Sequence, residues 1–248
     1  MMSDKEQLRM GIIGSNGRMG NVLISAIKQA GHLHMGGVDK DDDLDALASN
    51  CDILIDFSAP AALEDNLDIA MNHALPIIIG TTGLEERHHF LIDSAAQDIP
   101  IMQTGNTSMG VTMLAYLVEE AAAKLGDAWD IEIVEMHHRH KVDAPSGTAK
   151  LLGEAAAKGR GIKLSEHKDS GRDGITGTRK IGDIGFAALR GGSVAGDHDV
   201  IFAGDEELMT LSHRAENRMI FARGAVQAAY WLSRQKPGRY NMRDVLGL

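Results

Sequence analysis

Short apolar segments alternate with segments of helical periodicity over about the first hundred residues of the chain. Apolar runs typical of buried strands occur at residues 10–13, before 38, at 53–57, at 76–80 and at 101–102. Between them, apolar residues recur at helical spacing over 22–30, 63–70 and 90–96. Strands that alternate with helices imply right-handed crossovers and a parallel sheet covered on both faces. We therefore expect an α/β unit at the start of the chain.

The pattern changes after residue 107. It predicts a long helix over 108–125, a strand over 131–136, a helix over 147–158 and a last helix over 219–232. A loop rich in Gly, Lys and Asp runs to about residue 182, and three later segments look like antiparallel strands joined by Gly turns, namely 186–189, 199–203 and 208–211. We expect two domains: residues 1–107 with 219–248, and an α+β domain with a mixed sheet over 108–218.

A glycine-rich turn follows the first predicted strand and opens the first predicted helix. It reads Gly14, Ser15, Asn16, Gly17, Arg18, Met19 and Gly20. Glycines at such a turn let the backbone approach a pyrophosphate, and the helix start offers free N–H groups and the positive end of the helix dipole. The spacing is G-x-x-G-x-x-G, and many such turns are glycine-rich for backbone reasons alone. Its position in an alternating segment favours a Rossmann-type, dinucleotide-binding domain.

Asp39 follows Gly20 by about the ~20 residues expected of a carboxylate that binds the adenosine ribose. A solvated loop acid is the alternative, since three further Asp residues follow at 41–43. An acid here repels a 2'-phosphate, whereas the ammonium of Lys40 attracts one. We therefore expect NADH, NADPH or both as cofactor, with NADH slightly favoured.

Composition narrows the possible partners. The net charge is -10 and aromatic residues make up 4%, which argues against a broad nucleic-acid or anionic-membrane surface. A single cysteine, Cys51, cannot form an internal disulfide and fits a reducing compartment. Residues 1–10 are charged and lack the apolar core of a secretory signal, and no run approaches the ~20 apolar residues of a membrane span. The expected location is the cytoplasm.

Basic and titratable residues cluster where a predicted strand ends. The stretch runs from Glu135 through Met136, His137, His138, Arg139, His140, Lys141, Val142, Asp143, Ala144 and Pro145 to Ser146, Gly147, Thr148 and Ala149. Ser146 is a plausible helix N-cap, which leaves the N–H groups of Gly147 and Thr148 available to an anion. Histidine supplies a proton donor near neutral pH. The pattern predicts a pocket for a small carboxylate ligand.

Here the sequence closely resembles the dihydrodipicolinate reductase family. That family's signature is E-x-H-H-x-x-K-x-D-A-P-S-G-T-A, and every fixed position is met between Glu135 and Ala149. Further similar elements are G-R-M-G at 17–20, Phe57-Ser58, G-T-T-G at 80–83, I-G-F at 184–186 and M-R-D-V-L at 242–246. The resemblance covers essentially the whole chain.

The resemblance implies roles by matching position. His137 would be the proton donor and Lys141 the second catalytic residue, while His138, Lys141, Ser146, Gly147 and Thr148 would bind substrate carboxylates. Cofactor contacts would come from Gly14, Ser15, Asn16, Gly17, Arg18, Met19, Asp39, Lys40, Gly80, Thr81, Thr82, Thr104, Gly105, Asn106 and Thr107. The last segment departs from the family pattern, because family members often carry Pro or Ala before the Asn and an aromatic residue or Met after it, whereas this chain has Gly105 and Thr107 around Asn106.

The resemblance also implies the reaction and the assembly. A hydride from NADH or NADPH would reduce a cyclic dicarboxylate in lysine and diaminopimelate biosynthesis, and the enzyme would be a homotetramer formed through the sheet of the substrate domain. No metal is expected.

Three alternatives remain open. His138 and His140 share one face of an extended strand, as two metal ligands would, but no Cys or convincing third ligand lies nearby. A Rossmann module that senses nicotinamide redox state explains the glycine turn but not the basic cluster. A dehydrogenase of another small carboxylic acid explains both.

Overall fold

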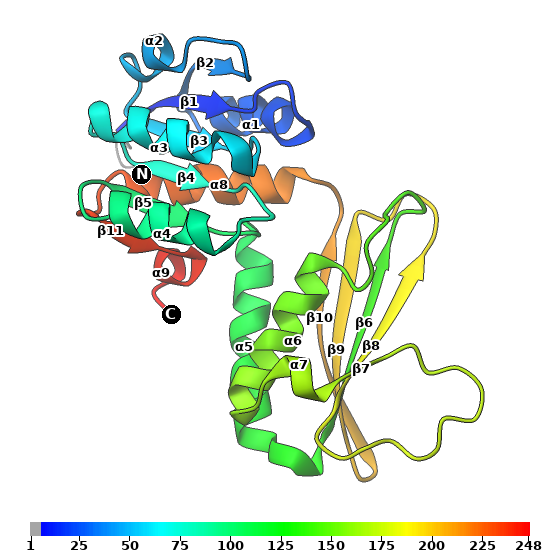
Figure 1. The fold of residues 1–248 in the computed structure, drawn as a ribbon. Coiled ribbons are helices and arrows are strands. Elements are labelled where there is room, and N and C mark those ends of the chain that lie inside the picture. Colours follow the sequence, from blue (N-terminus) through cyan, green and yellow to red (C-terminus); the bar gives the residue numbers. More distant parts are fainter. Residues whose placement is uncertain (1–5) are drawn as a thin grey trace, which may run out of the picture. The chain divides into compact units, whose positions relative to one another are not determined.

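The computed structural model describes residues 6–248, which divide into two compact units (Figure 1). Unit 1 comprises the described residues up to Met109 together with Arg218–Leu248, and unit 2 comprises Gly110–Asn217. Residues 1–5, part of the charged start on which the absence of a secretory signal was inferred, lie outside the described residues. Between residues 6 and 248, none of the helices combines the length and the apolar character that crossing a membrane requires.

Unit 1 is built on a 6-stranded sheet in which every neighbouring pair of strands is parallel. The strand order is β11-β5-β4-β3-β1-β2. The strands are β1 (Arg9–Ile13), β2 (Leu33–Val38), β3 (Ile53–Asp56), β4 (Ile77–Ile79), β5 (Pro100–Gln103) and β11 (Gly238–Tyr240). The parallel sheet confirms the predicted fold class. The chain reverses direction across the sheet between β1 and β3, the point where such sheets bind ligands at the carboxyl ends of their strands.

Helices cover both faces of this sheet (Figure 1). One apolar core joins the sheet to α1 (Arg18–Gln29), α8 (Met219–Leu232) and α9 (Met242–Leu246). The other joins it to α2 (Leu44–Ala48), α3 (Leu63–Asn72) and α4 (Glu86–Ala95), with a short 3-10 turn, η1, at Pro60–Ala62. Strands buried on both faces are apolar throughout, as β4 is, because neither face meets water.

Unit 2 contains a 5-stranded mixed sheet in the order β10-β9-β6-β8-β7. The strands are β6 (Asp130–His137), β7 (Lys168–Ser170), β8 (Ile184–Arg190), β9 (Gly196–Gly204) and β10 (Glu207–Ala215). The helices α5 (Met109–Leu125), α6 (Gly147–Arg160) and α7 (Leu164–His167) lie on one side of this sheet, and the turn η2 (Gly126–Ala128) precedes β6 (Figure 1). Their apolar faces enclose the core of the unit.

One expectation for unit 2 was wrong. The segment at 186–189 was expected to be antiparallel to its neighbours, but β8 pairs in parallel with both β6 and β7. The strand β9 is antiparallel to both of its partners, β6 and β10. The strand β6 lies between β8 and β9, so the Gly turn that joins β8 to β9 crosses over β6 and does not form a hairpin. Alternation of apolar residues shows which face a strand buries but not the direction in which it runs.

The central strand β6 alternates strictly between buried and half-buried positions. Ile131 and Ile133 face the apolar core with α5 and α6, and Glu135 and His137 continue on the same face. The period of two therefore carries two ionisable side chains into the interior near the start of α6.

Candidate active site

The predicted cofactor residues lie at one edge of the sheet of unit 1. They follow the carboxyl ends of β1 (Gly14 to Met19), β2 (Asp39 and Lys40), β4 (Gly80 to Thr82) and β5 (Thr104 to Thr107). Because parallel strands end at the same edge, residues far apart in sequence are brought to one place.

The glycine turn after β1 has the backbone geometry that a phosphate site needs. Gly14 has a φ of +84°, and a Cβ on Gly20 would lie 2.3 Å from the carbonyl oxygen of Ser15. Gly17 is the N-cap of α1, and no side chain there accepts a hydrogen bond from the helix. The first N–H groups of α1 are therefore left for an external acceptor.

Asp39 contacts this turn directly. Its Oδ2 accepts hydrogen bonds from Ser15 Oγ at 2.9 Å and from the Asn16 N–H at 3.0 Å. The carboxylate is half-buried, whereas the neighbouring Lys40 is exposed. Asp39 thus both shapes the turn and places a negative charge beside it.

Asp56, at the end of β3, is a fully buried carboxylate behind the same edge. It accepts hydrogen bonds from the Ser58 N–H at 2.7 Å, from Asn66 Nδ2 at 3.2 Å and from Thr81 Oγ1 at 3.3 Å. Burial raises the pKa of Asp56 above its ordinary value, although these hydrogen bonds act to lower it. The hydroxyl of Thr81 is therefore engaged with Asp56, while Thr82 is exposed.

The segment after β5, residues 104–107, also contains both side chains engaged within the unit and an exposed residue. Thr104 Oγ1 donates to the Asn106 carbonyl at 2.8 Å and accepts from the Asn106 N–H at 3.1 Å. Thr107 is 2% exposed, and its hydroxyl donates to the carbonyl of Phe221 at 2.7 Å. Gly105 is exposed. The Thr107 side chain is turned into unit 1, which leaves Gly105 as the accessible residue of this segment.

In unit 2, Glu135 is the centre of a buried hydrogen-bond network. Its Oε2 accepts from His137 Nδ1 at 2.6 Å, and its Oε1 accepts from the Ser146 N–H at 3.1 Å. Arg190 binds both oxygens, each at 2.8 Å. Burial raises the pKa of Glu135, but the hydrogen bonds from Arg190 and His137 outweigh it and hold this pKa below its ordinary value. Glu135 is therefore an ionised carboxylate.

An ionised carboxylate only accepts hydrogen bonds, so Nδ1 of His137 carries a proton. The opposite nitrogen, Nε2, is the atom that can exchange a proton with a ligand. The strand β9 passes close to it, because a Cβ on Gly196 would lie 2.9 Å from Nε2 of His137. A side chain at Gly196 would displace the imidazole.

Ser146 caps α6 as predicted, and its Oγ accepts from the Ala149 N–H at 3.1 Å. The same oxygen forms a 3.0 Å hydrogen bond with Nε2 of His198, a buried residue of β9. Burial, followed by the charge of nearby His137, lowers the pKa of His198 to about 4. Gly147 is exposed, and a Cβ there would meet nothing within 4 Å. The start of α6 is thus held in place through Ser146 and exposed at Gly147.

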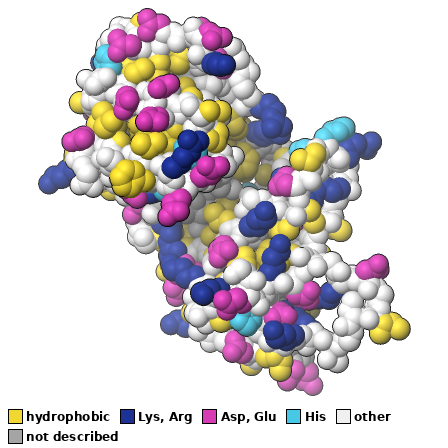
Figure 2. Space-filling view, viewed as in Figure 1, with side chains coloured by type: hydrophobic (Ala, Val, Ile, Leu, Met, Phe, Trp, Pro, Cys, Tyr) yellow, Lys and Arg dark blue, Asp and Glu magenta, His cyan; other side chains and the backbone are white. Residues whose placement is uncertain are grey.

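The rest of the basic cluster lies in the loop after β6, where Figure 2 shows histidine side chains beside Lys and Arg at one end of unit 2. Lys141 forms a 2.8 Å ion pair with Asp143, and this hydrogen bond lowers the pKa of Asp143. Arg139 and His140 are exposed, and His138 is half-buried, with ring centroids of His138 and His140 6.3 Å apart. Over residues 6–248, no group of three His, Cys, Asp or Glu side chains is placed to hold a metal ion.

Two residues of this network carry no sequence signal of their own. Arg190 comes from β8 and His198 from β9, and both lie more than forty positions from the cluster that they contact. Glu135 stood in the motif without an assigned role. Its place two residues before His137 in a strand, hence on the same face, was the signal that could have identified it.

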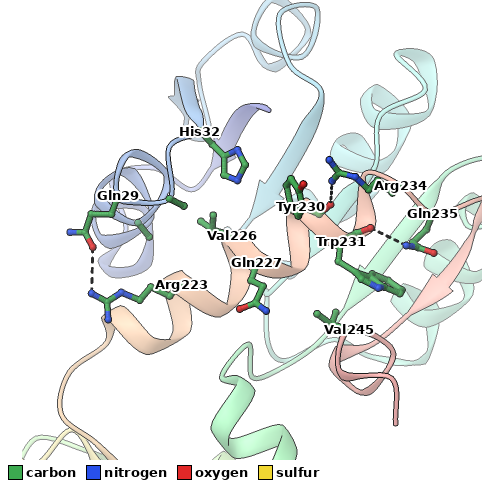
Figure 3. A pocket seen from close by; sticks show the side chains of 12 residues that line it. Gln29, His32, Arg223, Val226, Gln227, Tyr230, Trp231, Arg234, Gln235 and Val245 are labelled. Carbon is green, nitrogen blue, oxygen red and sulfur yellow. Dashed lines mark hydrogen bonds between the residues drawn. The ribbon is translucent and has the colours of Figure 1, made fainter. Parts of the chain in front are cut away.

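A separate hollow of about 730 Å³ lies on unit 1 beside α1 and α8 (Figure 3). It includes His32, Tyr230 and Trp231, and none of the predicted site residues lines it. Its two arginines are already engaged, since Arg223 donates to Gln29 and Arg234 stacks on Tyr230 at 3.7 Å from the ring centroid. The buried charges and the open helix start favour the network around Glu135 as the candidate active site.

Two models of one protein family match the two halves of the chain. Residues 8–107 match the N-terminal domain model of dihydrodipicolinate reductase, and residues 110–246 match the C-terminal one. A 4-hydroxy-tetrahydrodipicolinate reductase of Zymomonas mobilis is 55% identical over 254 residues, with 100% of both chains covered. One from Rhodopseudomonas palustris strain HaA2 is 48% identical over 271 residues, covering 100% of this chain and 99% of its own.

The fold also matches a solved structure, that of the dipicolinate-bound dihydrodipicolinate reductase of Paenisporosarcina sp. TG-14. The TM-score is 0.75 at 20% identity, with 95% of this chain and 98% of that chain covered.

Proposed function

The chain belongs to the dihydrodipicolinate reductase family, and we propose that His137, held by Glu135, is the proton donor of its reaction. The activity is that of the family, the pyridine-nucleotide-dependent reduction of 4-hydroxy-tetrahydrodipicolinate in lysine and diaminopimelate biosynthesis. Within it, residues 1–107 and 219–248 bind the dinucleotide, and residues 108–218 bind the substrate.

The residues of unit 1 fit a dinucleotide. A side chain at Gly14 or Gly20 would collide with the backbone of the turn region, and α1 begins without a side-chain cap, so its first N–H groups are left for a pyrophosphate. Asp39 stands beside the turn, where a ribose hydroxyl could donate to it. Because this carboxylate repels a 2'-phosphate while the exposed Lys40 attracts one, both NADH and NADPH are accepted, with NADH slightly favoured. The bound nicotinamide supplies the hydride.

The substrate is a cyclic dicarboxylate, and the dipicolinate in the Paenisporosarcina structure is a ligand of that class. In this chain we place the anion site at the start of α6, since Gly147 is exposed and a Cβ there would meet nothing within 4 Å. The first N–H groups of a helix also lack acceptors within the helix, and its positive dipole end favours an anion. Lys141 provides the cationic partner for a carboxylate, exchanging its contact with Asp143 for one with the ligand. His138 and Thr148 complete the set.

The chemistry then divides among the residues of unit 2. As the substrate ring gains a hydride, negative charge develops on its conjugated system. Nε2 of His137 delivers the proton that neutralises it, while Glu135 keeps Nδ1 protonated and fixes the ring. Lys141 stabilises the developing charge.

The 2.6 Å contact between Glu135 and His137 is the observation that supports this assignment. The test is His137→Gln, which keeps a polar side chain but delivers no proton, so that kcat should fall about 10²–10⁴-fold. NADH affinity should persist, because His137 lies outside unit 1. Lys141→Ala should lower kcat and also raise KM for the substrate. The exposed His140→Ala is the matched control and should change little.

Near-normal turnover of His137→Gln, measured as oxidation of NADH or NADPH that requires the cyclic dicarboxylate, would contradict the assignment. Equal damage from His140→Ala would instead favour a metal site, which metal analysis of the purified protein would test. A redox-sensing module would show no such turnover, and a dehydrogenase of another small acid would turn over a different substrate.

The proposed assembly rests on the exposed face of the sheet in unit 2. Leu189 is 51% exposed and Leu208 is 72% exposed, and Val134, Met136 and Ile201 share the side away from the helices. We propose that this face joins subunits of a homotetramer, since an apolar sheet face of this kind is stabilised by burial. Light scattering after size exclusion should give a tetramer, and Leu189→Glu should reduce it to smaller species.

The proposed location is the cytoplasm. The buried Cys51 is the single thiol of the chain, and burial raises its pKa to about 11, so it stays protonated and unreactive. The reaction also consumes a reduced nicotinamide nucleotide, and a cytoplasmic enzyme has access to a supply of that cofactor.

A further inference from the structure

Arg190 lies directly across from His137 in the parallel pair of β6 and β8. Its guanidinium donates to both carboxylate oxygens of Glu135, each at 2.8 Å. One of these oxygens, Oε2, also accepts the hydrogen bond from Nδ1 of His137. The carboxylate that holds the proposed proton donor is therefore shared with a permanent positive charge.

We propose that Arg190 is a positioning residue that sets the acid strength of His137 by sharing Glu135. This inference rests on the proposed role of His137 as proton donor. A buried carboxylate beside an imidazole stabilises the imidazolium and makes it a poorer acid. A guanidinium on the same carboxylate offsets that charge while leaving the hydrogen bond to Nδ1 in place. Arg190 thus lets Glu135 orient His137 without holding its proton too tightly.

The other groups around His137 do not replace this charge. From β9, His198 meets its ring edge-on with centroids 5.1 Å apart, and burial keeps His198 neutral at neutral pH by lowering its pKa to about 4. His213 on β10 lies opposite His198 in the antiparallel pair of β9 and β10. In the loop after β6, Lys141 is paired with Asp143. Across residues 6–248, the ion pairs found for Glu135 are those with His137 and Arg190.

Arg190 also holds the loop that carries Lys141. It donates to the carbonyl of Asp143 at 2.7 Å, and the carboxylate of Asp143 binds Lys141. A loss of activity alone would therefore not separate an electrostatic role from a structural one. The test therefore needs two variants that lose the same hydrogen bonds of Arg190 but differ in whether they keep its positive charge.

Two substitutions provide that match. Arg190→Lys and Arg190→Gln both lose the double hydrogen bond, but only Arg190→Lys keeps the charge. The readouts are the pH profile of kcat/KM and an NMR titration of the His137 ring protons in the ligand-free enzyme. In Arg190→Gln, the alkaline limb of the kcat/KM profile and the midpoint of the His137 titration should both move to higher pH by about one unit. A shift of this size is typical of the removal of a charge within about 4–6 Å. In Arg190→Lys they should stay near those of the wild type.

Equal shifts in both variants, or no shift in Arg190→Gln, would overturn the proposal. The control Arg172→Gln removes an arginine that binds Glu132 on the other face of β6, and should leave the profile unchanged. If Arg190→Gln does not fold, Glu135→Gln tests the effect of the Arg190 charge on His137, because it removes the carboxylate and keeps the guanidinium. It leaves Arg190 uncompensated, so the His137 midpoint should fall below the ordinary histidine range of about 6.5, and a midpoint within that range would refute the proposal.

The outcome is separable from that of the proposed function. Retention of the alkaline limb in His137→Gln would mean that the limb does not belong to His137, and the proton-donor assignment would fail. Loss of the limb in His137→Gln, with an unmoved profile in Arg190→Gln, would leave that assignment intact and remove only the role of Arg190.

Discussion

Replacing Glu135 with Gln should damage both stability and turnover, because this one carboxylate accepts four hydrogen bonds. A glutamine can reproduce only half of that pattern. If its oxygen keeps the Ser146 N–H and one nitrogen of Arg190, its NH₂ group faces two other donors, the second nitrogen of Arg190 and Nδ1 of His137. His137 must then accept at Nδ1 and carry its proton on Nε2 as a neutral ring.

The energetic cost can be worked from the burial of the partners. Removing one member of a buried ion pair costs about 3–5 kcal/mol, because the other charge is left uncompensated. Glu135 is 1% exposed, but the Arg190 side chain is 22% exposed and can recover part of its hydration. We therefore expect the lower end, a loss of about 3 kcal/mol in the free energy of unfolding. Since the imidazolium loses its acceptor, kcat should fall about 10²-fold or more.

Urea unfolding and steady-state kinetics measure the two effects. Glu132→Gln is the matched control, since Glu132 lies on the same strand, also binds two arginines (Arg172 and Arg179), and faces the other side of the sheet. It should leave kcat unchanged and cost less stability, because the Glu132 side chain is 26% exposed within its subunit, against 1% for Glu135. A Glu135→Gln enzyme with kcat within twofold of the wild type would refute the reasoning, as would equal losses of stability in the two variants.

Three further expectations concern the cofactor turn, the anion site and pH. Asp39→Asn removes a charge beside the turn, so the ratio of NADH to NADPH affinity should fall about tenfold, the value of one charge-assisted hydrogen bond; calorimetry that finds equal weakening would count against Asp39 as the ribose ligand. Gly147→Val adds a side chain where the structure is open, so substrate KM should rise while NADH affinity is kept, and unchanged values for both would move the anion site elsewhere. Because the folded pKa of His198, about 4, lies below the ordinary 6.5, the unfolded state takes up the proton first as pH falls between these values. Lowering the pH from 7 to 5 should therefore cost about 2 kcal/mol through this group, and urea unfolding of His198→Gln should show that much less acid sensitivity.

The sequence by itself determined the elements that depend on local periodicity. The α/β alternation of the first hundred residues, the glycine turn, the Ser146 cap and the long apolar helices were all predictable, because burial imposes periods of 2 and 3.6 on the chain. The strand β11 was not predicted, since Gly238–Tyr240 has no apolar run and is a strand only because β5 offers it an edge.

Other features were decided only by the tertiary structure. The direction of β8 depends on which strands it lies between, and no local pattern records that. Within the predicted site, the motif supplied His137 and Lys141, but the charge that balances Glu135 comes from Arg190, on a strand that reaches β6 only after the loop beyond α7. Likewise, Thr81 and Thr107 were both expected to contact the cofactor, yet their hydroxyls bind Asp56 and the Phe221 carbonyl. Sequence spacing specifies which face a side chain occupies, whereas its partners are set by long-range packing, because a hydrogen bond depends on distance in space and not along the chain.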